Sequence, residues 1–215
     1  MSITLVRFVS CLPKFIKKNK VQFRISKEKE IEEVLWTYCK MSFLKKWSSE
    51  LILPKFSKQL ESKLKKLTSK SLGNSVNYGY INLLNDGDRA LFLREFNSIY
   101  SLSKYKSVLN ILREKWQKTE RGFFQKITKI PDVKTVESYV CYITFYGSGG
   151  SFGRGNQIYV RANPDVKSDI TFSDYTIAHE LIHLMIEKLF KRKKLTQSSK
   201  EKLVDSIICK VGIGN

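Results

Sequence analysis

The sequence predicts an α+β protein in which a helical N-terminal region precedes a smaller unit of β-structure and two further helices. Two observations carry this prediction. Apolar residues recur at helical spacing through much of the first 121 residues, whereas the run SYVCYITFY at 138–146 is aromatic and β-branched, as is typical of a strand. We therefore expect two units, a basic helical region at 1–87 and a mixed unit at 88–215.

The composition is that of a globular chain. Of its 215 residues, 42% are hydrophobic and 27% are charged, which excludes a disordered tail and a membrane-spanning protein. No run approaches the roughly 18 apolar residues that a membrane span needs, and the first residues lack the apolar stretch of a signal peptide. We therefore expect a cytoplasmic protein whose four cysteines, none of them in a CxxC pair, stay reduced.

Helical periodicity defines the elements of the N-terminal region and of the segment after it. Ser26, Asp88 and Ser103 stand at the starts of periodic stretches and are residue types that cap helices. The predicted elements are helices at 27–47, 55–70, 88–100 and 103–121 and a loop at 71–87.

A glycine-rich segment, GSGGSFGRG at 147–155, joins the strand at 138–146 to a second strand, QIYVR at 157–161. The segment lacks the GK[ST] sequence of a phosphate-binding loop and leads into a strand rather than a helix. We therefore predict a β-hairpin over 138–161, with the glycines in its loop.

The residues that carry chemistry lie in a helix predicted at 173–190 and capped by Ser173 or Asp174. This helix contains the motif His179-Glu180-Leu181-Ile182-His183, which holds both histidines of the chain. Residues four apart lie on one face of a helix, about 6 Å apart along its axis, so both imidazoles can reach one zinc ion. Glu180 stands between them, where it can take a proton from a zinc-bound water.

A catalytic zinc site needs a third protein ligand. Ile186 and Leu189 occupy the positions of the glycine and histidine of an HExxHxxGxxH motif, so that class is excluded. A helix predicted to start near Ser198 offers Glu201, and Asp205, one turn further, is placed to accept the outer N–H of a ligand histidine. In the alternative interpretation, Ser198 and Glu201 form a capping box and Glu201 binds only the start of its own helix.

The sequence HELIH followed by EKLVD resembles the HExxH…ExxxD arrangement of the gluzincin zinc metallopeptidases, the thermolysin-like class and its minimal members. The resemblance covers about residues 138–210 and implies a zincin-like unit. It implies that His179, His183 and Glu201 bind Zn²⁺, that Glu180 is the general base and that Asp205 orients a ligand histidine. It also implies that an edge strand holds an extended substrate, and the predicted hairpin at 138–161 stands at the matching place.

The chain departs from this family in one respect. Gluzincins commonly place a tyrosine or histidine after the motif to stabilise the oxyanion, and this chain has neither beyond residue 183. The candidates that remain are Tyr146, Tyr159, Arg161, Tyr175 and Arg192.

The charge of the chain indicates a partner besides a peptide substrate. Residues 1–70 hold 17 basic and 6 acidic residues and dominate the net charge of +19, so this region could bind an acidic partner. Lysine outnumbers arginine 30 to 9, which speaks against specific nucleic-acid binding.

The leading hypothesis is a zinc-dependent peptidase that acts on a peptide or protein. The basic run at 191–194 further predicts a preference for acidic residues in the substrate. One alternative is a basic protein that binds nucleic acid or an anionic surface and has a structural or vestigial zinc site. The other is a latent peptidase with one dedicated target.

Overall fold

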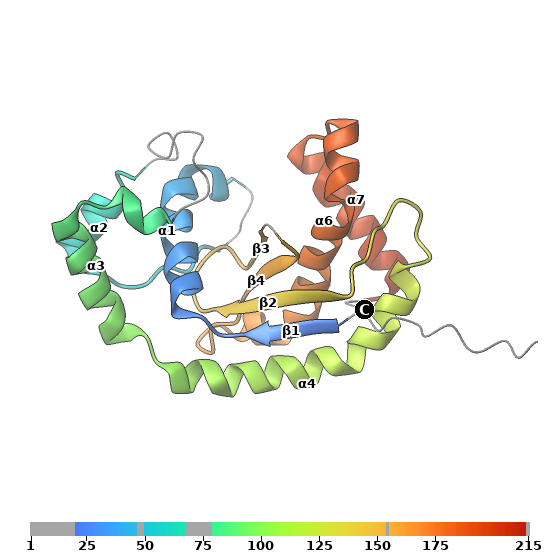
Figure 1. The fold of residues 1–215 in the computed structure, drawn as a ribbon, viewed down its shortest axis with the longest axis horizontal. Helices are drawn as coiled ribbons and strands as arrows, with labels where there is room; N and C mark the ends of the chain where they lie inside the picture. The colour runs from blue at the N-terminus through green and yellow to red at the C-terminus, as the bar shows by residue number, and fades with distance from the viewer. Residues whose placement is uncertain (1–19, 47–49, 68–78, 154, 214–215) are drawn as a thin grey trace, which may run out of the picture.

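The computed structural model describes residues 20–46, 50–67, 79–153 and 155–213. Its centre is a four-stranded sheet with the strand order β1-β2-β4-β3 (Figure 1). The strands are β1 (Lys20–Arg24), β2 (Ser138–Thr144), β3 (Gly150–Phe152) and β4 (Gln157–Arg161). β1, β2 and β4 are parallel, and β3 runs antiparallel to β4 at one edge of the described sheet.

Helices surround this sheet, so the protein is α+β, as the sequence predicts. Figure 1 shows α4 running beneath the sheet, α1 to α3 gathered at one end, and α6 and α7 at the other. The helices are α1 (Lys27–Leu44), α2 (Lys58–Leu64), η2 (Tyr80–Leu83, a 3₁₀ helix), α3 (Asp86–Ile99), α4 (Leu102–Ile127), α5 (Lys167–Thr171), α6 (Ser173–Lys193) and α7 (Gln197–Val211).

The predicted hairpin over 138–161 is wrong in its pairing. The two strands of the prediction, β2 and β4, lie side by side but are parallel. The glycine-rich segment between them contains β3, which forms the antiparallel hairpin with β4. Gly147 and Gly149 adopt φ angles of +116° and +108°, which non-glycine residues rarely reach, and these residues let the chain leave β2 and return as β3.

Several helix boundaries differ from the prediction, and for α3 the capping residue explains the difference. Ser26 caps α1 as expected, since its side chain accepts the N–H of Lys29. α3 begins earlier than predicted because Asn85, not Asp88, is its cap. α4 starts after Ser101 rather than Ser103 and continues to Ile127, and α2 is shorter than predicted. Much of the predicted loop at 71–87 lies outside the described residues, as does Cys11.

Two hydrophobic clusters hold these elements together. One lies between the sheet and α4, α6 and α7, and in it Leu112 and Leu181 are fully buried. The other lies among α1, α2 and α3, and in it Val34 is fully buried. Tyr100 and Tyr146 pack against both clusters, so the helical group is joined to the sheet through apolar contacts. Among the described residues, no helix has both the length and the apolar character to cross a membrane.

Candidate metal centre

Helix α6 presents two different faces, and this orients the HExxH residues. Ile177, Ala178, Leu181 and Ile182 are fully buried in the core between α6 and the sheet. Burial of this apolar face fixes the rotation of the helix about its axis. His179, Glu180 and His183 therefore lie together on the side that meets β3 and α7.

The two histidines and Glu201 converge on one point. Nε2 of His179 lies 3.0 Å from Nε2 of His183, and Oε2 of Glu201 lies 3.2 Å and 3.3 Å from these two nitrogens. Three ligand atoms around a tetrahedral zinc ion, each about 2.0–2.1 Å from it, would be roughly 3.3 Å apart. Lone pairs brought this close repel one another unless a proton or a cation lies between them, so the donor set fits Zn²⁺.

Glu201 reaches the histidines because α7 folds back along α6. The capping-box alternative is wrong: α7 begins after Thr196, whose side chain accepts the N–H of Ser199, so Ser198 is not the cap. The other carboxylate oxygen, Oε1, accepts a hydrogen bond from Nε2 of Gln197. Partial burial raises the pKa of Glu201, but hydrogen bonds with His179 and His183 outweigh burial and hold this pKa well below its usual value.

The electrostatics of His179 show the same balance. Burial lowers the pKa of His179, while the hydrogen bond with Glu201 and the charges of Glu180, Glu201 and Asp205 raise it, and the net shift is upward. The cluster of carboxylates thus favours positive charge at this position. A divalent cation supplies that charge and leaves the imidazole neutral, which is the form that binds metal.

Asp205 does not bind His179 directly. Its Oδ1 lies 3.9 Å from Nδ1 of His179, beyond hydrogen-bond distance, and accepts a hydrogen bond of 3.2 Å from the hydroxyl of Tyr175 instead. The Tyr175 ring is 5.9 Å from the His179 ring, so Tyr175 and Asp205 line the His179 side of the cluster together. Of the oxyanion candidates, Tyr175 is the one that contacts a residue of the cluster.

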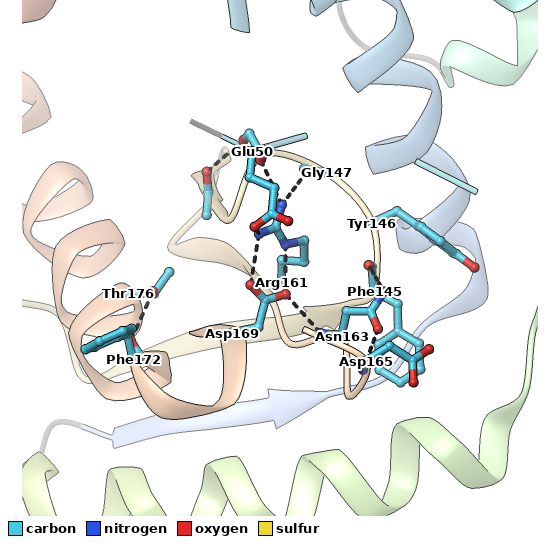
Figure 2. A network of polar contacts seen from close by, with 12 residues as sticks. Glu50, Phe145, Tyr146, Gly147, Arg161, Asn163, Asp165, Asp169, Phe172 and Thr176 are labelled. Atoms are coloured by element: carbon cyan, nitrogen blue, oxygen red, sulfur yellow. Dashed lines mark hydrogen bonds and ion pairs between the residues drawn. The ribbon is translucent and has the colours of Figure 1, made fainter. Parts of the chain in front are cut away.

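Arg161 is held in a separate buried network (Figure 2). Its Nε and Nη2 donate to the two carboxylate oxygens of Asp169 at 2.8 Å and 2.9 Å. Its Nη1 donates to the backbone carbonyls of Glu50 and Gly147. With its N–H groups engaged in this way, Arg161 anchors the segments after β2 and β4 and is not free to bind an oxyanion.

The other oxyanion candidates also have structural roles. Tyr159 donates a hydrogen bond to Gln157 and stacks on Tyr142. Tyr146 packs between the two hydrophobic clusters. Arg192 is exposed at the end of α6 and pairs with Asp132 at 3.3 Å.

Glu180 lies against the edge strand. The side chain is buried, and a Cβ built on Gly150 would be only 2.5 Å from its Oε1. Burial raises the pKa of Glu180, and the neighbouring histidines oppose that shift. The glycine at 150 is therefore required for β3 to pass this close to the carboxylate, a relation that the sequence alone did not reveal.

Helix α1 contributes two buried carboxyl groups that the sequence analysis did not single out, and one of them, Glu33, reaches the edge strand beside the site. Glu33 accepts a hydrogen bond of 3.3 Å from Ser151 in β3, and burial raises its pKa to about 8. Glu30 accepts the N–H groups of Phe145 and Tyr146, and burial raises its pKa also to about 8. Both lie on the stripe that α1 buries, and acidic residues within an apolar stripe are the signal that could have indicated them.

Phe152, at the end of β3, is the other residue that sequence reasoning missed. Its ring stacks on the imidazole of His183, with centroids 5.1 Å apart and planes 10° apart. Phe190 contacts the same imidazole at 5.7 Å. The side chain of Phe152 is nevertheless 38% exposed, so it forms part of the wall beside the cluster.

Comparisons with protein-family models, with curated proteins and with solved structures find no match.

Proposed function

We propose that the protein is a zinc-dependent peptidase of the gluzincin type. One observation carries the proposal: His179, His183 and Glu201 bring three ligand atoms together, and Glu180 lies between the two histidines in sequence and is buried beside the edge strand. Three protein ligands, with one position left for water, are the arrangement of catalytic rather than structural zinc sites.

The chemistry divides among groups of this chain. Zn²⁺, when bound, polarises the substrate carbonyl and lowers the pKa of water. Glu180 takes the proton from the attacking water and passes it to the leaving amine. Burial raises the pKa of Glu180, which makes its carboxylate a stronger base for this exchange. Tyr175, whose ring lies 5.9 Å from that of His179, is the candidate donor to the developing oxyanion, and its hydroxyl would exchange its hydrogen bond to Asp205 for one to the substrate.

The edge strand supplies a means of holding the substrate. On the side away from β4, β3 has no strand partner among the described residues. A peptide can add to such an edge through backbone hydrogen bonds, which position any sequence in extended form. Because Gly150 lies at Glu180 and Phe152 lies at His183, a peptide paired with β3 passes beside the cluster.

The test combines metal content with hydrolysis. After metal-free purification and addition of zinc, the protein should hold one zinc per chain and cleave members of a peptide library. Glu180→Gln should keep the zinc, while kcat/KM falls by about 10²-fold or more because the amide cannot accept the proton. Glu114→Gln, the same change at an exposed position of α4 outside the site, should leave both properties unchanged. Absence of bound zinc, or full activity of Glu180→Gln, would contradict the proposal.

The net charge of +19 favours a second candidate function, a basic protein that binds nucleic acid or an anionic surface, with a structural zinc site. This candidate predicts an affinity for DNA, RNA or acidic vesicles that falls steeply with salt. It also predicts that zinc-loaded protein cleaves no peptide in the library.

A further inference from the structure

A pocket lies beside the proposed metal centre and shares the side chain of Phe152 with it. Its volume is about 560 Å³. The lining comes from the segment before β2, from the end of β3 and from the turn of α6 that follows His183. Phe152 belongs both to this pocket and to the ring stack on His183, so one face of the pocket adjoins a ligand histidine.

Part of the pocket lining is apolar. Leu184 and Met185 line it from α6, and Val136 and Tyr139 line it from the start of β2. Met185 is held in place by its backbone, because its carbonyl accepts the N–H of Lys134 at 3.2 Å. This surface can receive the methylene groups of a side chain.

The charge of the pocket is positive. Lys134 and Lys188 line it, both are exposed, and within the described ranges neither forms an ion pair with a carboxylate. Glu187 also lines the pocket, but it is already paired with Lys191 at 2.7 Å. Two uncompensated ammonium groups beside an apolar wall favour a ligand with a short apolar stem and an anionic end.

We propose that this pocket binds the side chain of a glutamate in the substrate, close to the bond that is cleaved. The inference rests on the proposed peptidase function and adds to it a specificity that Lys134 and Lys188 determine. A peptide added to the outer edge of β3 advances about 3.3 Å per residue, so the glutamate should lie roughly one to three positions from the scissile bond. The pocket is a better source of an acidic preference than the basic run at 191–194. In that run, Lys191 and Arg192 are both paired with carboxylates.

Mapping cleavage sites in a peptide library at low salt tests this inference. Glutamate should be enriched at one fixed position, and its replacement by glutamine in a single peptide should lower kcat/KM by about twofold to thirtyfold, the range for two partly solvated charge pairs. The preference should weaken at 0.5 M salt. Lys134→Glu and Lys188→Glu should each reduce the preference, and the double variant should favour lysine or arginine at the same position. Lys118→Glu, an exposed residue of α4 outside the pocket, should change nothing.

A binding measurement separates failure of this inference from failure of the peptidase proposal. The zinc-loaded Glu180→Gln variant is titrated with fluorescent peptides that carry glutamate, glutamine or lysine at each position. Binding selective for glutamate and sensitive to Lys134→Glu and Lys188→Glu, without hydrolysis by the parent, would support the pocket and refute the peptidase. Hydrolysis without any preference for glutamate would refute the pocket and support the peptidase. Neither binding nor hydrolysis would overturn both.

Discussion

Replacing Gly150 by alanine should displace the carboxylate of Glu180. A Cβ at this position would lie 2.5 Å from Oε1, 2.9 Å from Cγ and 3.0 Å from Cδ of Glu180, and ordinary van der Waals contact begins near 3.4 Å. The carboxylate or the strand must therefore shift by roughly 0.9 Å. β3 is held by its pairing with β4 at Val160, whereas the side chain of Glu180 can change rotamer, so the carboxylate should be the group that moves.

The size of the effect follows from this displacement. A misplacement of about 1 Å in a catalytic group can lower a rate by about 10²-fold, so we expect kcat/KM of Gly150→Ala to fall by about that factor. Overpacking should also lower the free energy of unfolding by about 1–3 kcal/mol. Zinc content should stay at one per chain, because Glu180 is not one of the three converging residues.

The assay measures hydrolysis of a quenched fluorescent peptide, zinc content and thermal unfolding on the same preparations. Gly122→Ala is the control, since nothing lies within 4 Å of a Cβ at that position in α4, and it should keep full activity. Combining Gly150→Ala with Glu180→Gln should lower activity little beyond Glu180→Gln alone, because both changes act through one carboxylate. If Gly150→Ala keeps activity within twofold of the parent, the reasoning that β3 positions Glu180 is refuted.

Two further predictions concern Glu201 and Glu33. Glu201→Ala should weaken zinc binding by orders of magnitude, measured in competition with a chelator, whereas Ser198→Ala should leave the affinity unchanged. If Glu201→Ala binds zinc as tightly as the parent, Glu201 is not a ligand. The pKa of Glu33 is about 8 in the folded protein and 4.5 in the unfolded chain. Between these two pH values the folded protein therefore keeps a proton that the unfolded chain has already released. The free energy of unfolding should therefore fall as pH rises through this window, by up to about 1.4 kcal/mol per unit from this group. Urea unfolding of Glu33→Gln should show a shallower fall, and an unchanged slope would argue against a proton on Glu33.

The convergence of the histidines and Glu201 was predictable from the sequence because its main constraint is local. Two histidines four residues apart share a helix face whatever the rest of the fold does. Glu201 required one further step, a short reversal between α6 and α7, and the length of the intervening segment allows that reversal. The residues of this cluster are also of types that stand out, since the chain has no other histidine.

The pairing of the strands was not predictable in the same way. Alternation and β-branching indicate that 138–144 and 157–161 are strands, but these patterns contain no information on which strand lies beside which. β1 is five residues long with only two hydrophobic positions, and it becomes a strand because it pairs with β2 and buries Val21. Tertiary packing decides such short elements, and it also turns the glycine-rich segment into an edge strand instead of a simple loop.

The acidic residues of α1 connect the helical group to the chemistry of the site. A buried carboxyl group lowers stability unless its polar atoms find partners, and Glu33 has Ser151 as its partner in β3. A Cβ on Gly147 would lie 3.1 Å from Oε1 of Glu33, so this glutamate also packs against the turn that precedes β3. The same short stretch continues to Gly150, which lies against Glu180, so α1, β3 and Glu180 form one chain of contacts. The N-terminal helix therefore helps to set the position of the edge strand, and through that strand the position of Glu180.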